Sequence, residues 1–293
     1  MALCDLPVLN AQPNVPMVPS QRPIESGRLV NIYLAARCKF GRWALGGRET
    51  VTRISRGRAV KRPAQMLLTE ALNLDYVAQH TTIPVPRVHR MIKDKHGKLC
   101  MVMDYIEGQE LEQIWGQLSE EERLNIVHEL RGYIDQLRAL VPPHPGSVEA
   151  VDGGPCKDFR IYRPVFGPFA SVAEFCTFVG RDFMVERKLD EYPQYADAVL
   201  RCVGRTESYR TVFTHCDLAP RNIIIKDKKI AAIVDWEMAG WYPEYWEYTQ
   251  AEASNSYCRP WGFWEVFEKE GFSRRYPDEL MTELCIASEF TRC

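Results

Sequence analysis

Three polar side chains follow short β-rich runs in the last third of the chain. Asp217 and Asn222 lie at the two ends of a tight loop, and Asp235 ends the β-rich stretch that follows. Because such a loop and the end of the next hairpin can meet, we expect the three side chains to converge. Phosphoryl transfer needs magnesium on the phosphate oxygens and a carboxylate that orients and deprotonates the attacking hydroxyl. The pattern therefore predicts a phosphotransferase centre.

The order His-x-Asp-Leu-x-x-x-Asn, then hydrophobic residues, then Asp, resembles the protein kinase-like superfamily, most closely its aminoglycoside phosphotransferase and choline kinase branch. The resemblance implies that Asp217 is the catalytic base and that Asn222 and Asp235 bind magnesium. It also implies that His215 organises the loop. Arg221 is a further candidate, because an arginine near the base can neutralise charge on the transferring phosphate. The alternative is that these residues only form turns, where Asp and Asn are common.

The N-terminal part offers a second match to the same superfamily. Lys61 ends an expected strand and Glu70 lies in the next helix, which resembles the superfamily's ion pair between a strand lysine and a helix glutamate. Such a lysine holds the α- and β-phosphates of ATP. The alternative for this pair is a solvated strand end and a solvated helix face.

Residues 101–108 resemble the connector between the two lobes of these enzymes. The alternative is an ordinary strand that ends in a turn. The residues expected around adenine are Met103, Asp104, Tyr105 and Ile106. One departure is the absence of a Gly-x-Gly-x-x-Gly phosphate loop. The turn at Gly57 is the segment left to cover the nucleotide, and the strict need for ATP stays open.

The elements that would position these residues fall into two groups. The first group is a helix over 28–38, two strands within 50–61, a helix over 65–80, and a hairpin of strands 87–94 and 98–105. The second is a helix over 120–140, a long loop over 142–168, helices from 171 and over 195–203, a strand at 212–215, a hairpin of 223–226 and 230–236, and three helices within 244–293.

This order predicts an α+β, two-lobed protein kinase-like fold with a small β-rich N-terminal lobe and a larger, mainly helical C-terminal lobe that contains one isolated hairpin. The expected divisions are a flexible segment over 1–27, a nucleotide-binding lobe over 28–106, and a catalytic and substrate lobe over 107–293.

The composition restricts the partners. The 293 residues carry a net charge of -2, which gives no basic excess for nucleic acid. No apolar stretch is long enough to span a bilayer, so no membrane partner is expected. The ten cysteines lack zinc-site spacing, which indicates reduced thiols and a cytoplasmic protein. We expect a monomer that uses ATP and Mg²⁺.

The segment after Asp235 bears on the acceptor. It runs directly into an expected helix at Glu244 and leaves no room for the long activation segment that protein kinases use as a peptide platform. A small hydroxylated molecule is therefore the preferred acceptor, and a protein Ser/Thr kinase or a catalytically silent nucleotide-binding protein is the alternative. Several tryptophans and glutamates in this region suggest an amine-bearing acceptor, or else simple helix packing: Trp236, Trp241, Trp246, Trp261, Trp264, Glu237, Glu244 and Glu247.

Overall fold

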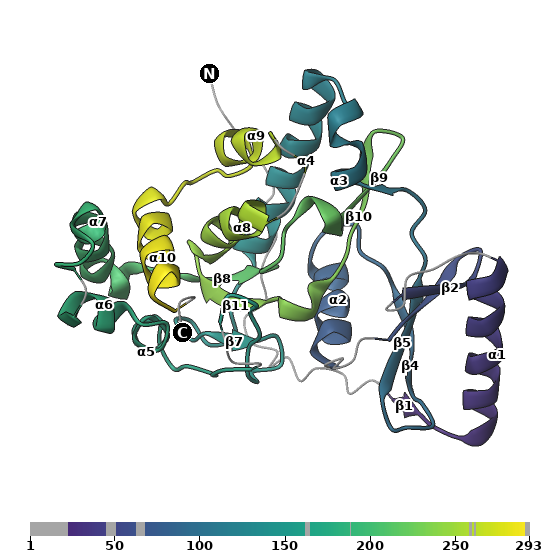
Figure 1. Cartoon of the computed structure of the whole chain (residues 1–293). Coiled ribbons are helices and arrows are strands. Elements are labelled where there is room, and N and C mark those ends of the chain that lie inside the picture. Colours follow the sequence, from purple (N-terminus) through teal and green to yellow (C-terminus); the bar gives the residue numbers. More distant parts are fainter. Residues whose placement is uncertain are drawn as a thin grey trace, which may run out of the picture.

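The computed structural model describes residues 23–44, 51–62, 68–161, 165–187, 189–257, 260 and 262–290. It has the two-lobed α+β architecture that the sequence predicts: a five-stranded sheet between two helices at one end, and a larger, mainly helical part at the other (Figure 1). The domain boundaries at residues 27 and 106 stay predictions. Among the described residues, no helix is both long and apolar enough to cross a membrane.

The N-terminal sheet has the strand order β1-β4-β5-β3-β2. Its strands are β1 (Ile24–Glu25), β2 (Val51–Ser55), β3 (Arg58–Lys61), β4 (Val88–Lys93) and β5 (Leu99–Asp104). Helix α1 (Arg28–Ala44) packs on one face and α2 (Leu68–His80) on the other. Alternating side chains of β5 explain this arrangement, because Cys100 and Val102 contact the α1 cluster while Met101 and Met103 join the cluster that contains α2.

Helix α1 runs past the predicted end at residue 38 because Gly41 lets it approach β2 closely. A β-carbon at Gly41 would lie 1.9 Å from the carbonyl oxygen of Arg53, so only glycine fits there. On the same side of α1, Leu34 and Cys38 are buried against Ile54. The helix is therefore fixed to the outer face of the sheet.

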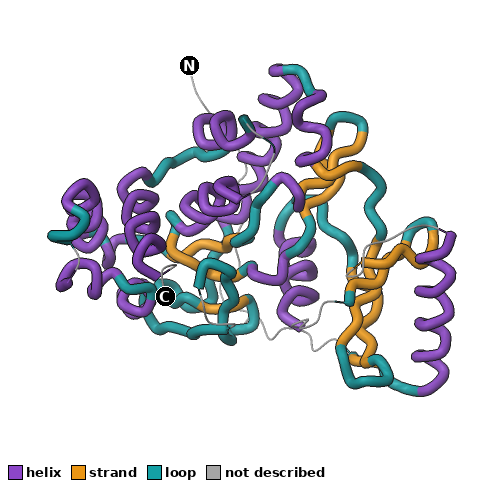
Figure 2. Tube along the Cα trace, in the orientation of Figure 1, coloured by secondary structure: helices purple, strands orange, loops and turns teal. Residues whose placement is uncertain are grey.

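The C-terminal lobe differs from the prediction in its sheets. In place of one isolated hairpin, it has two three-stranded sheets, with the orders β10-β9-β6 and β7-β11-β8 (Figure 2). The extra strands β6 (Gln109–Glu110), β7 (Glu149–Ala150) and β11 (Gly240–Pro243) are too short to give a period-two pattern. The predicted strands are β8 (Thr211–Thr214), β9 (Ile223–Lys226) and β10 (Lys229–Ile233).

The helices of this lobe include all those predicted. They are α3 (Leu111–Ile114), α4 (Glu120–Ala139), α5 (Val172–Phe178), α6 (Arg181–Arg187), α7 (Pro193–Gly204), α8 (Trp246–Tyr257), α9 (Phe263–Glu270) and α10 (Pro277–Phe290). Helix α4 begins with the capping box that the sequence indicates, in which Ser119 and Glu122 bond each other's backbone amides. One continuous core joins α2 to this lobe, so the two parts of the chain share buried contacts.

Candidate active site

The loop after β8 is held by the imidazole of His215. Its Nε2 lies 3.1 Å from the carbonyl oxygen of Val234, and its Nδ1 accepts a 3.1 Å hydrogen bond from the amide of Asp217. These two contacts require a neutral ring that donates from Nε2. Complete burial lowers the pKa of His215 to about 4, which keeps the ring neutral. His215 thus connects the loop to the backbone immediately before Asp235.

The carboxylate of Asp217 is bonded on both oxygens. Arg221 donates to Oδ1, and the side-chain amide of Asn222 donates to Oδ2 at 2.8 Å. Asn222 also donates to the backbone oxygen of Asp217 at 2.8 Å. Burial raises the pKa of Asp217 to about 6, and the Arg221 charge opposes that rise. A carboxylate with such a pKa is a base at neutral pH.

Lys61 joins the two lobes. Its ammonium donates to Glu70 Oε1 and to Asp235 Oδ1, at 2.7 Å in each case. Burial works to lower the pKa of Lys61, but the charges of Glu70 and Asp235 outweigh it and raise this pKa. Burial would likewise raise the pKa of Asp235, and the Lys61 charge reverses this so that the pKa is lowered. Both groups are therefore charged at neutral pH.

Asp235 reaches this position through an unusual backbone conformation. Its φ of 68° lies in the left-handed region, and a 3₁₀ helix, η4 (Trp236–Met238), follows at once. The amide of Val234 donates to the backbone oxygen of Asn222 at 2.9 Å, which places the two predicted metal ligands on neighbouring strands of chain. The buried Asn73 of α2 donates to the backbone oxygens of Trp236 and Ala239, at 2.7 and 3.0 Å.

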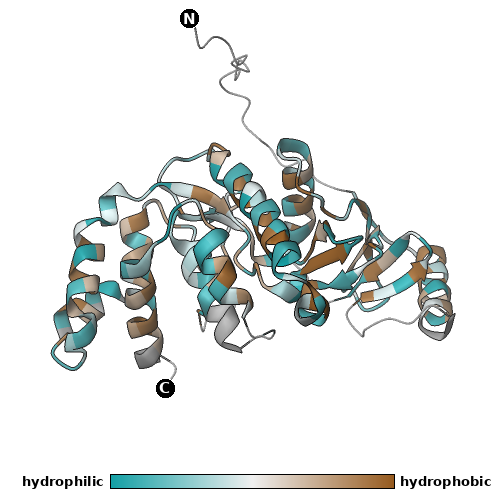
Figure 3. Cartoon of the chain, turned by 90° about the horizontal axis from the view of Figure 1, so that it is seen from above, coloured by the Kyte–Doolittle hydropathy of each residue, from teal (hydrophilic) through white to brown (hydrophobic). Residues whose placement is uncertain are grey.

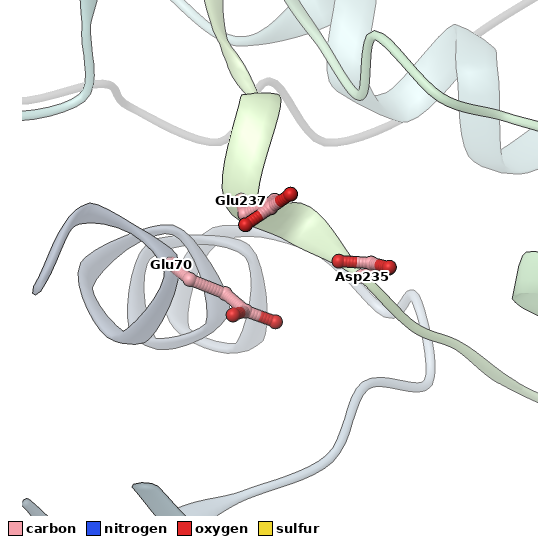
Figure 4. Close-up of side chains that lie close together, drawn as sticks. All are labelled: Glu70, Asp235 and Glu237. Atoms are coloured by element: carbon pink, nitrogen blue, oxygen red, sulfur yellow. The ribbon is translucent and has the colours of Figure 1, made fainter. Parts of the chain in front are cut away.

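Three carboxylates gather where a metal is expected. One oxygen each from Glu70, Asp235 and Glu237 lie within 4.8 Å of one another (Figure 4). Oxygen ligands of this kind suit Mg²⁺. Glu237 was not among the predicted ligands, and Asn222 lies beside the same cleft with its amide nitrogen already bonded to Asp217. The donor set fits a divalent cation.

A cleft of about 500 Å³ lies between the lobes. The residues predicted for nucleotide binding line it, together with three from the catalytic segments: Lys61, Glu70, Met103, Asp104, Tyr105, Ile106, Arg221, Asn222 and Asp235. Two connector amides are already bonded, since Asp104 donates to the Arg87 oxygen at 3.0 Å and Tyr105 donates to the Gly57 oxygen at 3.2 Å. In the described part of the chain the amide of Ile106 makes no such bond.

A protein-family model matches most of the chain and shows its family. Residues 22–266 match the model of the phosphotransferase enzyme family. The chain belongs to this family. No match was found among curated proteins.

Solved structures of other phosphotransferases share the fold. Aminoglycoside phosphotransferase APH(4)-Ia in a ternary complex with AMP-PNP and hygromycin B is 15% identical, with a TM-score of 0.52 over 85% of this chain and 87% of that chain. The GDP and kanamycin complex of an aminoglycoside 2″-phosphotransferase is 13% identical, with a TM-score of 0.53 over 89% of both chains. At this identity the likeness shows the fold alone.

Glu247 holds the loop that follows β8. It lies in the first turn of α8, is fully buried, and accepts a 2.6 Å hydrogen bond from the amide of His215. Burial raises its pKa to about 7. The sequence pattern suggested an amine site for Glu247, and its contact with the loop was not predicted. No local sequence signal marks such a long-range contact.

The part of the predicted 142–168 loop around Lys157 borders the candidate site. Lys157 forms a 2.8 Å ion pair with Glu237, and its backbone oxygen accepts from the hydroxyl of Tyr242 at 3.1 Å. The buried Asp158 accepts a 2.8 Å bond from the indole of Trp246. This part of the loop is thereby fixed beside the metal-ligand candidates.

The tryptophans that suggested an amine-binding site belong to the core instead. Trp236, Trp241 and Trp246 are at most 1% exposed and pack against other aromatic rings, so they offer no accessible face to a ligand. Trp264 is half-buried against the same core, and Trp261 lies outside the described residues. The helix-packing interpretation is therefore the correct one for the buried three.

Proposed function

We propose that this phosphotransferase transfers the γ-phosphate of ATP to a hydroxyl group of a small molecule. The observation that carries the proposal is the position of Lys61, whose ammonium contacts Glu70 and Asp235 at 2.7 Å in a cleft that also contains Asn222. A cation and several oxygen ligands at one end of such a cleft are the groups that bind and activate a nucleoside triphosphate.

The nucleotide would lie with its base against the connector and its phosphates toward Lys61. Of the amides of Asp104, Tyr105 and Ile106, that of Ile106 has no backbone partner among the described residues and would donate to the base. Arg53 stacks 4.0 Å over the ring of Tyr105 at the cleft wall, and both residues line the cleft. Lys61 would exchange its contact with Asp235 for one with the phosphates and keep Glu70 as its partner.

Asp235, Asn222 and Glu237 would hold magnesium, with Glu70 close by. The ion neutralises charge on the phosphate oxygens when it is bound. Glu237 would leave its ion pair with Lys157 to do so. In support, the carboxylate oxygens of Asp235 and Glu237 already lie within 4.8 Å of each other.

Asp217 would orient the acceptor hydroxyl and take its proton. The hydroxyl oxygen forms a bond to the γ-phosphorus, the bond from that phosphorus to the bridging oxygen of ADP breaks, and the proton passes to Asp217. Arg221 would turn from Asp217 toward the transferring phosphoryl group, whose charge it can neutralise. His215 and Glu247 act as positioning residues for this loop.

A small acceptor is favoured over a peptide by the short segment after Asp235. Residues 236–238 form η4 and β11 follows, paired with both β7 and β8, so this stretch is part of a sheet. Two of the similar structures are complexes with hygromycin B and kanamycin, which are small hydroxylated molecules. The amine-bearing acceptor loses its support, because the tryptophans that suggested it are buried.

The test is a screen of the purified protein with ATP or GTP, magnesium and pooled hydroxylated metabolites and peptides, read as phosphate gain by mass spectrometry. With an acceptor in hand, Asp217→Asn should lower turnover by about 10²- to 10⁴-fold while nucleotide binding persists. Asp227→Asn is the matched control, since Asp227 lies in the exposed β9–β10 turn and should leave turnover unchanged. Full turnover in Asp217→Asn, or phosphate gain only on peptides, would refute the proposal.

A further inference from the structure

Helix α1 carries an apolar stripe on the face turned away from the sheet. Its exposed large side chains are Leu29 (82% exposed), Ile32 (57%), Tyr33 (55%) and Phe40 (50%). Isolated exposed apolar residues are ordinary, but a concentration of large ones on a single helix usually marks a binding surface. The helix stands at the outer end of the molecule, beyond the sheet (Figures 1 and 3). None of its residues lines the cleft.

The spacing of these residues places them on one side of the helix. With about 100° per residue, positions 29, 32, 33, 36 and 40 fall within an arc of roughly 100°. The side opposite this arc holds Leu34 and Cys38, which are buried against the sheet. Because Gly41 sets α1 close against β2, the helix cannot easily roll to bury the stripe. The outward face is thus fixed by the packing of the inward face.

Basic side chains flank the stripe. Arg28 and Lys39 lie on one edge of the arc and Arg37 lies on the other, at about 70° to 90° from its centre. The 17 residues of α1 include no aspartate or glutamate. In the described part of the chain, none of these three basic residues forms an ion pair. An apolar stripe between basic edges is the arrangement of a helix that lies in a membrane interface.

We propose that α1 docks the protein onto an anionic lipid surface, with the stripe in the acyl boundary and Arg28, Arg37 and Lys39 at the headgroups. This is attachment to a surface, and it revises the expectation that no membrane partner exists. A second copy of the chain fits less well, because pairing two α1 helices would bring like charges together. An anionic surface supplies the complementary charge. Docking through α1 leaves the cleft open, since the sheet separates them.

The test is flotation of the full chain with vesicles of phosphatidylcholine alone or mixed with phosphatidylserine. We expect binding to the mixed vesicles that weakens as salt is raised. The double variant Ile32→Ser with Phe40→Ser should lower the partition coefficient by about tenfold or more, because it removes apolar area from the bilayer. Arg37→Gln with Lys39→Gln should lower it by about fivefold per charge on anionic vesicles only.

The matched control is Val141→Ser with Leu200→Ser, which removes two exposed apolar side chains outside α1, at 80% and 50% exposure. This control should bind vesicles like the unaltered chain, and all variants should keep its melting temperature. The proposal fails if the unaltered chain does not bind anionic vesicles, or if the Ile32 and Phe40 substitutions leave vesicle binding unchanged. It also fails if the chain does not bind vesicles and instead forms a dimer in analytical ultracentrifugation that the Ile32 and Phe40 substitutions dissociate.

Discussion

At the scale of single residues, burial and a neighbouring charge have opposite effects on the pKa of Asp217. Burial raises its pKa to about 6, and the guanidinium of Arg221 limits the rise. Asn222 bonds the second oxygen at 2.8 Å and so fixes the plane of the carboxylate. The proposed proton acceptor is therefore both oriented and charged at neutral pH.

Replacing Arg221 with Gln should move the acid limb of the pH profile to higher pH. Without the guanidinium, the hydrogen bond from Asn222 still opposes burial but the neighbouring charge does not. The pKa of Asp217 therefore rises above about 6, and the carboxylate is protonated at pH values where it was charged. Each pKa unit costs about tenfold in active base below the pKa. The measurement is kcat/KM against pH. Arg210→Gln, which removes an exposed arginine paired with Glu244, is the control and should keep the original limb. An unmoved limb in Arg221→Gln would show that the two groups are not coupled.

Asp217, Asn222 and Asp235 could be predicted as candidates because their order and spacing match the pattern of phosphotransferases. Glu237 was not predicted as a metal-ligand candidate, because a glutamate two positions after Asp235 has no meaning until the left-handed turn at Asp235 and the following 3₁₀ helix bring both carboxylates together. The acceptor also stayed open, since burial of the tryptophans depends on contacts between distant helices.

At the scale of elements, α2 connects the two halves of the site. Glu70 on this helix bonds Lys61 of the sheet, and Asn73, one turn later, bonds the segment that follows Asp235. Residues three apart on a helix lie on the same face, which explains how one helix makes both contacts. The sequence indicated this helix and its glutamate, but nothing local pointed to Asn73.

Replacing Asn73 with Ala should destabilise the protein. The backbone oxygens of Trp236 and Ala239 would lose a buried donor, at a cost of about 1 to 3 kcal/mol for each unsatisfied group. We expect a loss of about 2 to 4 kcal/mol in the free energy of unfolding by urea, together with weaker magnesium binding by calorimetry. Asn125→Ala, an exposed asparagine on α4, is the matched control. Stability equal to that of the control would contradict this role.

Most long elements were predicted, because helices and strands with a clear period are marked in the sequence. The two-residue strands β1, β6 and β7 and the strand β11 were not, since they are too short or lack alternation. Their partners lie far along the chain, as in the pairing of Trp241 with both Glu149 and Phe213. Only the folded chain specifies such pairs.

At the scale of the whole molecule, nucleotide binding between the lobes should stabilise the fold. At about 100 times its dissociation constant, Mg²⁺–ATP adds about 2.7 kcal/mol to the free energy of unfolding, which should raise the melting temperature by several degrees. Lys61→Met should lose most of this gain because the phosphates lose their cation. Lys226→Met, which alters an exposed lysine, should keep it. A full thermal shift in Lys61→Met would place the nucleotide elsewhere.

The two-lobed fold was predicted from the order of the elements, and the family match agrees with it. The lobes are less independent than that order suggests, because one core runs from α2 into the C-terminal helices. Sequence periodicity shows which face of an element is apolar. It does not show which distant element covers that face.

The double attachment of α2 bears on how a cell would control this protein. Because Lys61 contacts both Glu70 and Asp235 in this structure, the proposed reaction would need no movement of α2. Formation of the proposed site would then need only side-chain exchanges, by Lys61, Glu237 and Arg221, in the folded chain. Its output would then follow the rates of its synthesis and breakdown and the supply of its two substrates, and not an activating modification.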